Sequence, residues 1–355
     1  MKNKIQVGLV FGGKSSEHGV SLISGWNIYN GFDKNKYEII PIGISKDGLW
    51  YQGINEGIWI NSENPKTVSI DTSQRLITVV RRGMEIWTSG VHDGKFISRI
   101  DIFFPITHGT FGEDGCLQGF FETLGADYVG PGVLGSAVSM DKDVSKRLLR
   151  DAGIKQSKFH TIRKSEKNND VLINKIIKDL KFPIFVKPAN QGSSVGVSKS
   201  ENKIGLKKSI TQAFKFDKKV ILEEAIKGRE IECAILGNEN PIASELGEIV
   251  LTKGFYSYDA KYIEEDAAKP VVGIKLPNDV KNKIQKTAIE VYKILECEGL
   301  SRVDFFLTND NKIYVNEINT LPGFTNISMY PKLMEFSGVK YAKLLDKLVT
   351  LAMKK

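Results

Sequence analysis

Residues 1–139 alternate strand-like and helix-like stretches, and this alternation constrains the fold more than any other feature of the sequence. Apolar, β-prone stretches occur at 5–11, 37–45 and 101–107, and helix-like stretches at 20–32 and 116–125. Such β-α-β alternation favours a parallel sheet covered by helices. Residues 46–98 carry shorter, more polar strand patterns, which indicate an insertion or a set of hairpins.

The chain after residue 139 is predicted to contain a second group of helices and strands. A helix is predicted over 139–153, with Ser139 as its N-cap and Gly153 as its stop. Residues 251–272 have weak periodicity and are predicted to form a long loop. The remaining elements are predicted strands at 182–188, 220–226 and 229–236, helices near 201–214 and 279–297, and two further strands followed by two C-terminal helices.

Bulk properties exclude several classes of protein. A chain of 355 residues suggests two or three packed units. Its net charge of +8 comes from basic residues that are spread along the sequence without a nucleic-acid-binding motif, so we expect no nucleic-acid partner. No apolar run is long enough to span a bilayer, and the N-terminus lacks the pattern of a signal peptide. Three widely spaced cysteines, Cys116, Cys233 and Cys297, fit a reducing cytosol.

The stretch YVNEINTLPG, residues 314–323, contains a candidate metal site. Residues two apart on a strand share a face, so Glu317 and Asn319 point the same way. A two-residue hairpin turn centred on Asp310 and Asn311 would place Asp304 opposite Glu317, and Arg302 opposite Asn319. Opposed carboxylates repel unless a cation neutralises them, and an all-oxygen ligand set favours Mg²⁺ or Mn²⁺. The alternative is a solvated hairpin face.

A glycine- and serine-rich stretch, FVKPANQGSSVGV at 185–197, is the candidate phosphate-binding loop. Lys187 ends a predicted strand, Gly192 and Gly196 permit tight or left-handed backbone, and Ser193 and Ser194 supply hydroxyl and N–H groups. The order of residues differs from the P-loop, in which the lysine follows the glycines. A plain hairpin turn is the alternative for this loop.

Seven stretches together give the chain a family resemblance. They are FGGKSSEHGVS, HGTFGEDGCLQG, SMDK, FVKPANQGSSVGVSK, YDAKY, SRVDFFL and NEINTLPGFT, and they run nearly end to end. In this order and spacing the chain resembles the ATP-grasp enzymes, and among them the D-alanine–D-alanine ligases. The resemblance implies a Rossmann-like N-terminal α/β domain (1–139) followed by a two-lobed α+β ATP-grasp fold (140–222 and 223–355) that holds ATP between its lobes.

The resemblance also implies a role for each matching residue. Two Mg²⁺ or Mn²⁺ ions are expected at Asp304, Glu317 and Asn319. Catalytic roles are implied for Glu17, which would anchor the ammonium of the first D-alanine, and for Arg302 and the Gly323 N–H, which would stabilise an oxyanion. ATP is expected to contact Lys142, Lys187, Ser194, Glu223, Glu230 and Lys261. Ser328 is expected to hold the carboxylate of the second substrate, and His108 to lie near the first substrate. For a lone histidine such as His108, a hydrogen-bonded structural role is the alternative.

In such enzymes the stretch 251–272 is a lid over the site. The resemblance implies that Lys261 reaches the transferred phosphate and that Tyr262 bonds to Ser193 and Glu17 when the lid closes. Two residues depart from the family pattern: Gly19 stands where relatives usually carry an acidic residue, and Glu224 where they often carry lysine. Gly19 lies close to Glu17, so the missing charge would alter either the electric field of the substrate pocket or only a helix-cap contact.

The expected function is the ATP-dependent ligation of two D-alanines through an acyl phosphate, for peptidoglycan precursor synthesis in the cytoplasm. Small-molecule substrates, a homodimer and no membrane partner are implied. A D-alanine–D-serine or D-alanine–D-lactate ligase is the first alternative, and Tyr262 favours D-alanine as the nucleophile over D-lactate. A non-catalytic ATP-binding protein on the same fold is a further alternative, disfavoured because Asp304, Glu317, Asn319 and Arg302 are all present.

Overall fold

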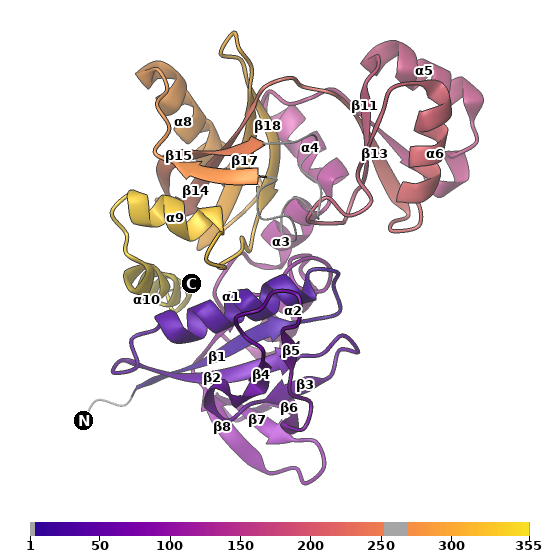
Figure 1. Ribbon diagram of the computed structural model, residues 1–355. Helices are drawn as coiled ribbons and strands as arrows, with labels where there is room; N and C mark the ends of the chain where they lie inside the picture. Colours follow the sequence, from indigo (N-terminus) through magenta and orange to yellow (C-terminus); the bar gives the residue numbers. More distant parts are fainter. Residues whose placement is uncertain (1–3, 252–267, 355) are drawn as a thin grey trace.

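The computed structural model describes residues 4–251 and 268–354. Figure 1 shows three groups of elements: the N-terminal domain in indigo and purple, a small lobe built around β11 and β13, and a larger lobe built around β14, β15, β17 and β18. Among the described residues, no helix is both long enough and apolar enough to cross a membrane.

The N-terminal domain is built on a seven-stranded sheet in the order β8-β7-β6-β3-β2-β1-β9. Its elements are β1 (Ile5–Gly12), α1 (His18–Gly31), β2 (Tyr37–Ile44), β3 (Trp50–Gln52), η1 (Asn55–Ile58), β4 (Trp59–Ile60), β5 (Ser69–Ile70), β6 (Arg75–Arg82), β7 (Glu85–Gly90), β8 (Phe96–Ile100), β9 (Ile102–Pro105) and α2 (Cys116–Leu124).

This sheet confirms the predicted parallel core and its hairpin insertion. Strand β1 pairs in parallel with β2 and β9, while the ladders from β2 through β3, β6 and β7 to β8 are antiparallel. The antiparallel part corresponds to residues 46–98. Because parallel strands direct their carboxyl ends to one edge, the loops after β1 and β9 emerge together, and these loops carry Glu17 and His108.

The small lobe is a four-stranded antiparallel sheet in the order β10-β13-β11-β12. The elements from 133 to 224 are α3 (Val133–Met140), α4 (Lys142–Asp151), β10 (Phe159–Arg163), η2 (Lys164–Glu166), α5 (Asp170–Leu180), β11 (Ile184–Pro188), β12 (Ser198–Ser200), α6 (Lys203–Ala213) and β13 (Lys219–Glu224). Apolar residues of α5 and α6 pack on the sheet in one buried cluster that includes Ile176, Ile210 and Val186.

The large lobe is a five-stranded antiparallel sheet in the order β16-β15-β14-β17-β18. Its elements are β14 (Arg229–Leu236), β15 (Ile242–Leu251), β16 (Ala268–Val272), α8 (Asn278–Ile294), β17 (Leu300–Leu307), β18 (Ile313–Asn319), α9 (Met329–Phe336) and α10 (Tyr341–Ala352). Helix α8 packs with Ile231, Cys233 and Ile235 of β14, and α9 belongs to a separate cluster with the alternate residues Ala234 and Leu236. The two helices therefore cover opposite faces of this sheet.

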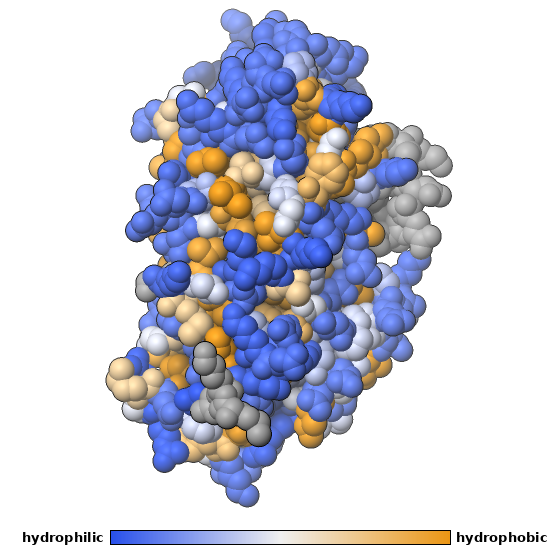
Figure 2. All heavy atoms as spheres, turned by 90° about the vertical axis from the view of Figure 1, so that its left-hand side faces the viewer, coloured by the Kyte–Doolittle hydropathy of each residue, from blue (hydrophilic) through white to orange (hydrophobic). Residues whose placement is uncertain are grey.

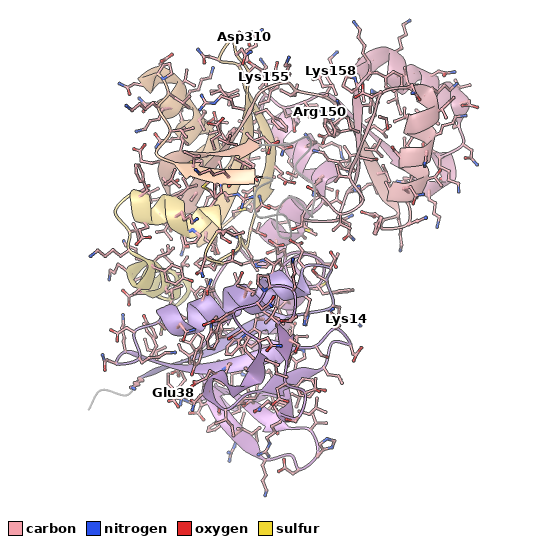
Figure 3. All side chains as sticks on the ribbon, viewed as in Figure 1. Lys14, Glu38, Arg150, Lys155, Lys158 and Asp310 are labelled. Carbon is pink, nitrogen blue, oxygen red and sulfur yellow. The ribbon has the colours of Figure 1, made fainter. Side chains whose placement is uncertain are left out.

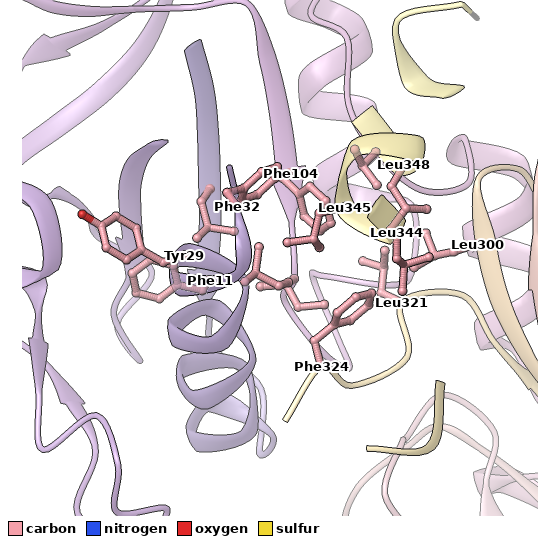
Figure 4. Close-up of a cluster of buried hydrophobic side chains, with 14 of the residues drawn as sticks. Phe11, Tyr29, Phe32, Phe104, Leu300, Leu321, Phe324, Leu344, Leu345 and Leu348 are labelled. Atoms are coloured by element: carbon pink, nitrogen blue, oxygen red, sulfur yellow. The ribbon is translucent and has the colours of Figure 1, made fainter. Parts of the chain in front are cut away.

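One hydrophobic cluster joins the N-terminal domain to the C-terminal end of the chain. Phe11 of β1 and Phe104 of β9 belong to the same buried cluster as Leu344 and Leu345 of α10, and Figure 4 shows these side chains converging with Leu321 and Phe324. The face shown in Figure 2 is mostly hydrophilic, with smaller groups of hydrophobic residues among the polar ones. The C-terminal helix thus contributes to the core of the N-terminal domain.

Three local predictions need correction. The predicted N-cap at Ser139 is wrong, since Ser139 lies inside α3 and the carboxylate of Asp141 caps α4 by accepting hydrogen bonds from the N–H groups of Asp143 and Val144. The predicted loop over 251–272 is wrong at its end, because 268–272 forms β16 on β15. Helix α5 and strands β10, β12 and β15 were not anticipated. Gly153, with φ of +76°, does follow the end of α4 as predicted.

Candidate functional site

The hairpin of β17 and β18 places the predicted metal ligands as expected. Asp304 lies opposite Glu317, and Arg302 opposite Asn319. The predicted two-residue turn is wrong, however. Thr308 N bonds to Lys312 O, so the loop has Asp310 at its centre, and Figure 3 shows Asp310 at the tip. The register shifts by one residue at a bulge between Asp304 and Phe305, and this shift restores the predicted pairing at the site.

The charges on this sheet face form a row across three strands. Arg302 makes two hydrogen bonds to Asp304, at 2.7 and 2.8 Å, and its Nε lies 3.0 Å from Glu232 Oε2. Asn319 Nδ2 donates to Asp304 Oδ2 at 3.0 Å. Glu232, which lies opposite Asp304 on β14, was missed by sequence reasoning. Glu230 and Glu232 lie two residues apart along that strand, and this spacing could have identified Glu232 from the sequence.

The donor set of this row suits a hard divalent cation. Two opposed carboxylates, Asp304 and Glu317, and the amide of Asn319 present oxygen atoms on one face. Mg²⁺ and Mn²⁺ prefer such oxygen ligands, and Mg²⁺ commonly binds one or two protein carboxylates together with phosphates and water. The residues present therefore fit the expected cation.

Helix α4 brings lysines to both lobes. Lys142 and Lys146 are one helical turn apart. Lys142 Nζ lies 3.5 Å from Glu317 Oε2 and donates to Gln191 O at 2.8 Å. Lys187, at the end of β11, lies 2.9 Å from Glu223 Oε2 and 3.4 Å from Asn316 Oδ1. Two of the predicted ATP ligands, Lys142 and Lys187, thus reach β18, and Lys187 is paired with a third, Glu223.

Lys146 is a second residue that sequence reasoning missed. Its Nζ lies 3.3 Å from Glu223 Oε1 and 3.2 Å from Ser157 Oγ. Burial would raise the pKa of Glu223, but the charges of Lys146 and Lys187 lower that pKa to about 2. Burial opposes the charge of Lys187, yet Glu223, Glu317 and Glu230 together hold the pKa of Lys187 above its ordinary value. Both groups are therefore charged at neutral pH.

The glycine- and serine-rich loop meets the N-terminal domain at Glu17. Ser193 Oγ donates a hydrogen bond to Glu17 Oε1. A Cβ added to Gly192 would lie 2.4 Å from Glu17 Oε2, so only glycine permits this approach. The positive φ angles of the loop fall on Ser193, Ser194 and Gly196, at +47°, +60° and +71°. Gly192 therefore serves close packing, and Gly196 has the left-handed backbone that the sequence suggested.

A second carboxyl group, Glu113, lies beside Glu17. Glu113 accepts hydrogen bonds from Gly109 N at 2.6 Å and Leu321 N at 3.2 Å. Burial and the negative charge of Glu17 raise the pKa of Glu113 from 4.5 to about 8 despite these two donors. Sequence reasoning missed Glu113 because it assigned the functional role in the motif HGTFGEDG to His108.

The residues expected around the substrates occupy one neighbourhood. His108 is buried, with Nδ1 3.0 Å from Leu321 O and Nε2 3.2 Å from Ser24 Oγ. Burial lowers the pKa of His108 to about 4, so the ring is neutral at physiological pH. A Cβ on Gly323 would lie 2.7 Å from Ser328 Oγ, which brings these two predicted residues together. Lys261 and Tyr262 lie outside the described residues.

The two departures from the family pattern have different surroundings. Glu224 Oε1 accepts a hydrogen bond from Lys158 N at 2.8 Å and thereby ties β13 to the segment before β10. A Cβ added to Gly19 would lie 3.7 Å from Pro65 O, which is ordinary contact. Packing therefore does not exclude a side chain at position 19, and nothing in the structure explains the glycine.

Comparisons with known proteins agree with this arrangement. Residues 6–131 match the family described as D-ala D-ala ligase N-terminus, and residues 148–350 match D-ala D-ala ligase C-terminus. The chain is 47% identical over 351 residues to a D-alanine–D-alanine ligase of Proteus mirabilis (strain HI4320), covering 99% of this chain and 96% of the relative.

Two solved structures have the same fold. The D-alanine–D-alanine ligase from Coxiella burnetii is 36% identical, with a TM-score of 0.83 and coverage of 99% of this chain and 96% of that one. The VanG D-Ala:D-Ser ligase from Enterococcus faecalis is also 36% identical, with a TM-score of 0.85 and coverage of 99% and 100%. The predicted fold, an N-terminal α/β domain followed by a two-lobed ATP-grasp unit, is confirmed.

Proposed function

The chain belongs to the D-alanine–D-alanine ligase family, and on this premise we propose how its residues join two D-alanines at the expense of ATP. It is an ADP-forming ligase whose product, D-alanyl-D-alanine, serves peptidoglycan precursor synthesis. The observation that carries the assignment of roles is the meeting of Asp304, Glu317, Lys142 and Lys187 from four different elements.

The nucleotide is assigned to the junction of the two lobes. Lys142 and Lys187 would contact its phosphates, with Ser194 supplying loop contacts. Glu223 and Glu230 would hold the adenine side and the ribose hydroxyls. Asp304, Glu317 and Asn319 would hold two Mg²⁺ or Mn²⁺ ions, which neutralise phosphate charge. Lys261 remains a proposed phosphate ligand by resemblance alone.

The first D-alanine is assigned to the N-terminal side of the site. Glu17 would hold its ammonium group, since Ser193 Oγ donates a hydrogen bond to this carboxylate, and the backbone N–H of Glu17 is held by Ser15 Oγ at 2.8 Å. The carboxylate of this D-alanine attacks the γ-phosphorus of ATP, and ADP leaves. Lys142 and Lys187 offset the negative charge of the reacting groups.

The second step is acyl transfer. The nitrogen lone pair of the second D-alanine forms the new C–N bond, and the carbonyl π electrons move to oxygen. The resulting oxyanion lies against Arg302 and the Gly323 N–H. When the carbonyl reforms, the C–O bond to the phosphate breaks, inorganic phosphate leaves, and the amine proton passes to solvent. Ser328 would hold the carboxylate of the second D-alanine.

The test measures phosphate release and dipeptide mass with ATP and Mg²⁺ and one of four substrates. D-Alanine is expected to give phosphate and D-alanyl-D-alanine, and L-alanine alone to give neither. If the protein forms a dipeptide with D-serine, or a depsipeptide with D-lactate, as fast as it forms D-alanyl-D-alanine, the chain belongs with the alternative ligases. ATP binding without turnover on any substrate would contradict the proposal and support a non-catalytic role.

The choice of second substrate rests on Tyr262. The D-serine ligase shares the fold at 36% identity, whereas curated D-alanine relatives reach 47–49%. Depsipeptide-forming relatives tend to lack this tyrosine, so we expect Tyr262→Phe to raise D-lactate incorporation relative to D-alanine. An unchanged product ratio would contradict the assignment.

Three further features are proposed from the resemblance. We assign the enzyme to the cytoplasm and to a homodimer, which light scattering at micromolar concentration would test against a monomer. We also propose domain boundaries at 139/140 and, between the two lobes, after Glu224. The boundary expected at 222/223 needs this correction because it would divide β13, which pairs along its whole length in the small lobe.

A further inference from the structure

The segment Leu321–Phe324 follows β18 and carries Pro322 and Gly323 at its centre. Leu321 and Phe324 are buried in the cluster that joins the N-terminal domain to α10, as Figure 4 shows. Their side chains anchor both ends of the segment. The peptide N–H of Gly323, which the proposed function assigns to the oxyanion, lies between these two anchors.

Four backbone groups that flank Gly323 are bonded by side chains of the N-terminal domain. Leu321 N donates to Glu113 Oε1 at 3.2 Å, and Leu321 O lies 3.0 Å from His108 Nδ1. Phe324 N donates to Ser24 Oγ at 3.1 Å, and Phe324 O accepts from Asn27 Nδ2 at 3.0 Å. The backbone on both sides of Gly323 is therefore held by a domain that contributes no strand to this lobe.

Two of these side chains also bond to each other. Ser24 Oγ lies 3.2 Å from His108 Nε2. Ser24 Oγ accepts the Phe324 N–H, so its own proton is available to His108 Nε2, and Nδ1 of the neutral ring donates to Leu321 O. The bonds form a closed circuit from Leu321 through His108 and Ser24 to Phe324.

The ends of this segment are held by the circuit and not by a turn hydrogen bond. A Pro-Gly pair at the centre of four residues is typical of a type II turn, which needs a positive φ at its third residue and usually closes by a bond from the first C=O to the fourth N–H. Gly323 does not have that positive φ, so the segment is not a type II turn. Within the described segment 321–324 no direct bond joins Leu321 O to Phe324 N. His108 and Ser24 occupy both groups instead, so they determine how far apart the ends of the segment lie.

We propose that His108 and Ser24 are positioning residues that orient the Gly323 N–H, and that His108 is not a substrate ligand. This inference rests on the proposed function, because it concerns the oxyanion of the acyl-transfer step. Both ring nitrogens of His108 already have partners, and the side chain is buried. The circuit acts on acyl transfer alone. Phosphoryl transfer from ATP, the first step, forms no oxyanion at the carboxyl carbon of the first D-alanine.

The test compares phosphate release with dipeptide formation in Ser24→Ala. The wild-type reaction releases one phosphate per dipeptide by its stoichiometry. With the Gly323 N–H misplaced, acyl transfer slows by about 10- to 100-fold, and water hydrolyses the waiting acyl phosphate. We expect the ratio of phosphate to dipeptide to rise well above one while the KM for ATP stays unchanged.

Two further variants keep the test decisive. Asn27→Asp is isosteric and half-exposed, so it is expected to fold, and it replaces the donor to Phe324 O by an acceptor; the ratio is expected to rise as well. Ser136→Ala removes an equally buried hydroxyl, bonded to Pro131 O at 3.3 Å, and serves as the matched control with a ratio of one.

Three results would overturn the inference, and a fourth would refute the proposed function on which it rests. If Ser24→Ala and Asn27→Asp both release one phosphate per dipeptide, whether or not dipeptide formation slows, the circuit does not act on acyl transfer. Activity that falls only in parallel with the melting temperature would reduce it to a structural role. Loss of D-alanine binding in His108→Asn, at a ratio of one, would restore His108 as a ligand. Failure of the wild type to form dipeptide would instead refute the proposed function.

Discussion

Lys146 Nζ lies 3.3 Å from Glu223 Oε1, and both side chains are less than 5% exposed. Glu223 is also paired with Lys187, so one buried carboxylate is shared by two lysines. If Lys187 turned toward a phosphate, as the proposed function requires, Lys146 would still compensate the charge of Glu223. An uncompensated buried carboxylate would be costly, so the second lysine would allow Lys187 to change partners.

Lys146→Met is expected to weaken ATP binding and to destabilise the protein. Glu223 would then compete with the phosphates for Lys187, which raises the KM for ATP by about 10-fold, and the lost bonds would lower the free energy of unfolding by about 1–3 kcal/mol. Steady-state kinetics and urea unfolding would measure the two effects. Lys158→Met, at an exposed lysine, is the control, and an unchanged KM for ATP would contradict the shared-carboxylate account.

Glu317→Gln is expected to raise the Mg²⁺ concentration required for half-maximal activity. The substitution removes one of the two opposed carboxylates and also the partner of Lys142. Loss of a charged ligand should weaken cation binding by at least about 10-fold. A Mg²⁺ titration of phosphate release would measure the shift. Glu248→Gln, which loses only its pair with Arg229, should keep the wild-type curve, and the same curve for Glu317→Gln would refute the metal assignment.

Gly192→Ala is expected to disturb the first substrate site more than the nucleotide site. The added Cβ would lie 2.4 Å from Glu17 Oε2, so the carboxylate must move away from its bond with Ser193. We expect the KM for the first D-alanine to rise by about 10-fold or more, since even small misplacements of a positioning group are costly. Gly205→Ala is the matched control, because its Cβ would meet only Asn202 Oδ1 at 3.5 Å. Equal effects of both substitutions would contradict the role of Glu17.

Glu113 makes the stability of the protein depend on pH. Burial and the charge of Glu17 raise the folded-state pKa of Glu113 to about 8, above its ordinary value of 4.5. The folded state therefore binds more protons than the unfolded state between these two values. The contribution is complete below pH 4.5 and is lost as the pH rises toward 8.

Urea unfolding of the wild type and of Glu113→Gln at pH 5, 6, 7 and 8 would test this dependence. The wild type is expected to lose free energy of unfolding relative to the variant as the pH rises, by an amount on the order of a few kcal/mol. A difference that stays constant across this range, or that grows in favour of the wild type, would show that the pKa of Glu113 is not raised.

The metal hairpin shows how far local patterns determined the site. The period of two along a strand placed Glu317 and Asn319 on one face, and the turn-rich stretch between two strands predicted a hairpin. The assumed turn was wrong by one residue, and the bulge at Asn316 corrected the register before the site. The sequence carries no simple signal for such a bulge, because it depends on how both strands pack in the sheet.

The sequence alone determined the order of most strands and helices, the residues that share a strand face, and the motifs that identify the family. These features depend on backbone periodicity and on residue types that are close along the chain. It did not determine which charges meet. Lys146 with Glu223, Arg302 with Glu232, and His108 with Ser24 and Leu321 come from separate elements, and only tertiary packing brings them together. Burial makes each of these pairings necessary, because a polar group removed from water needs a partner at bonding distance, and the folded chain decides which partner is within reach.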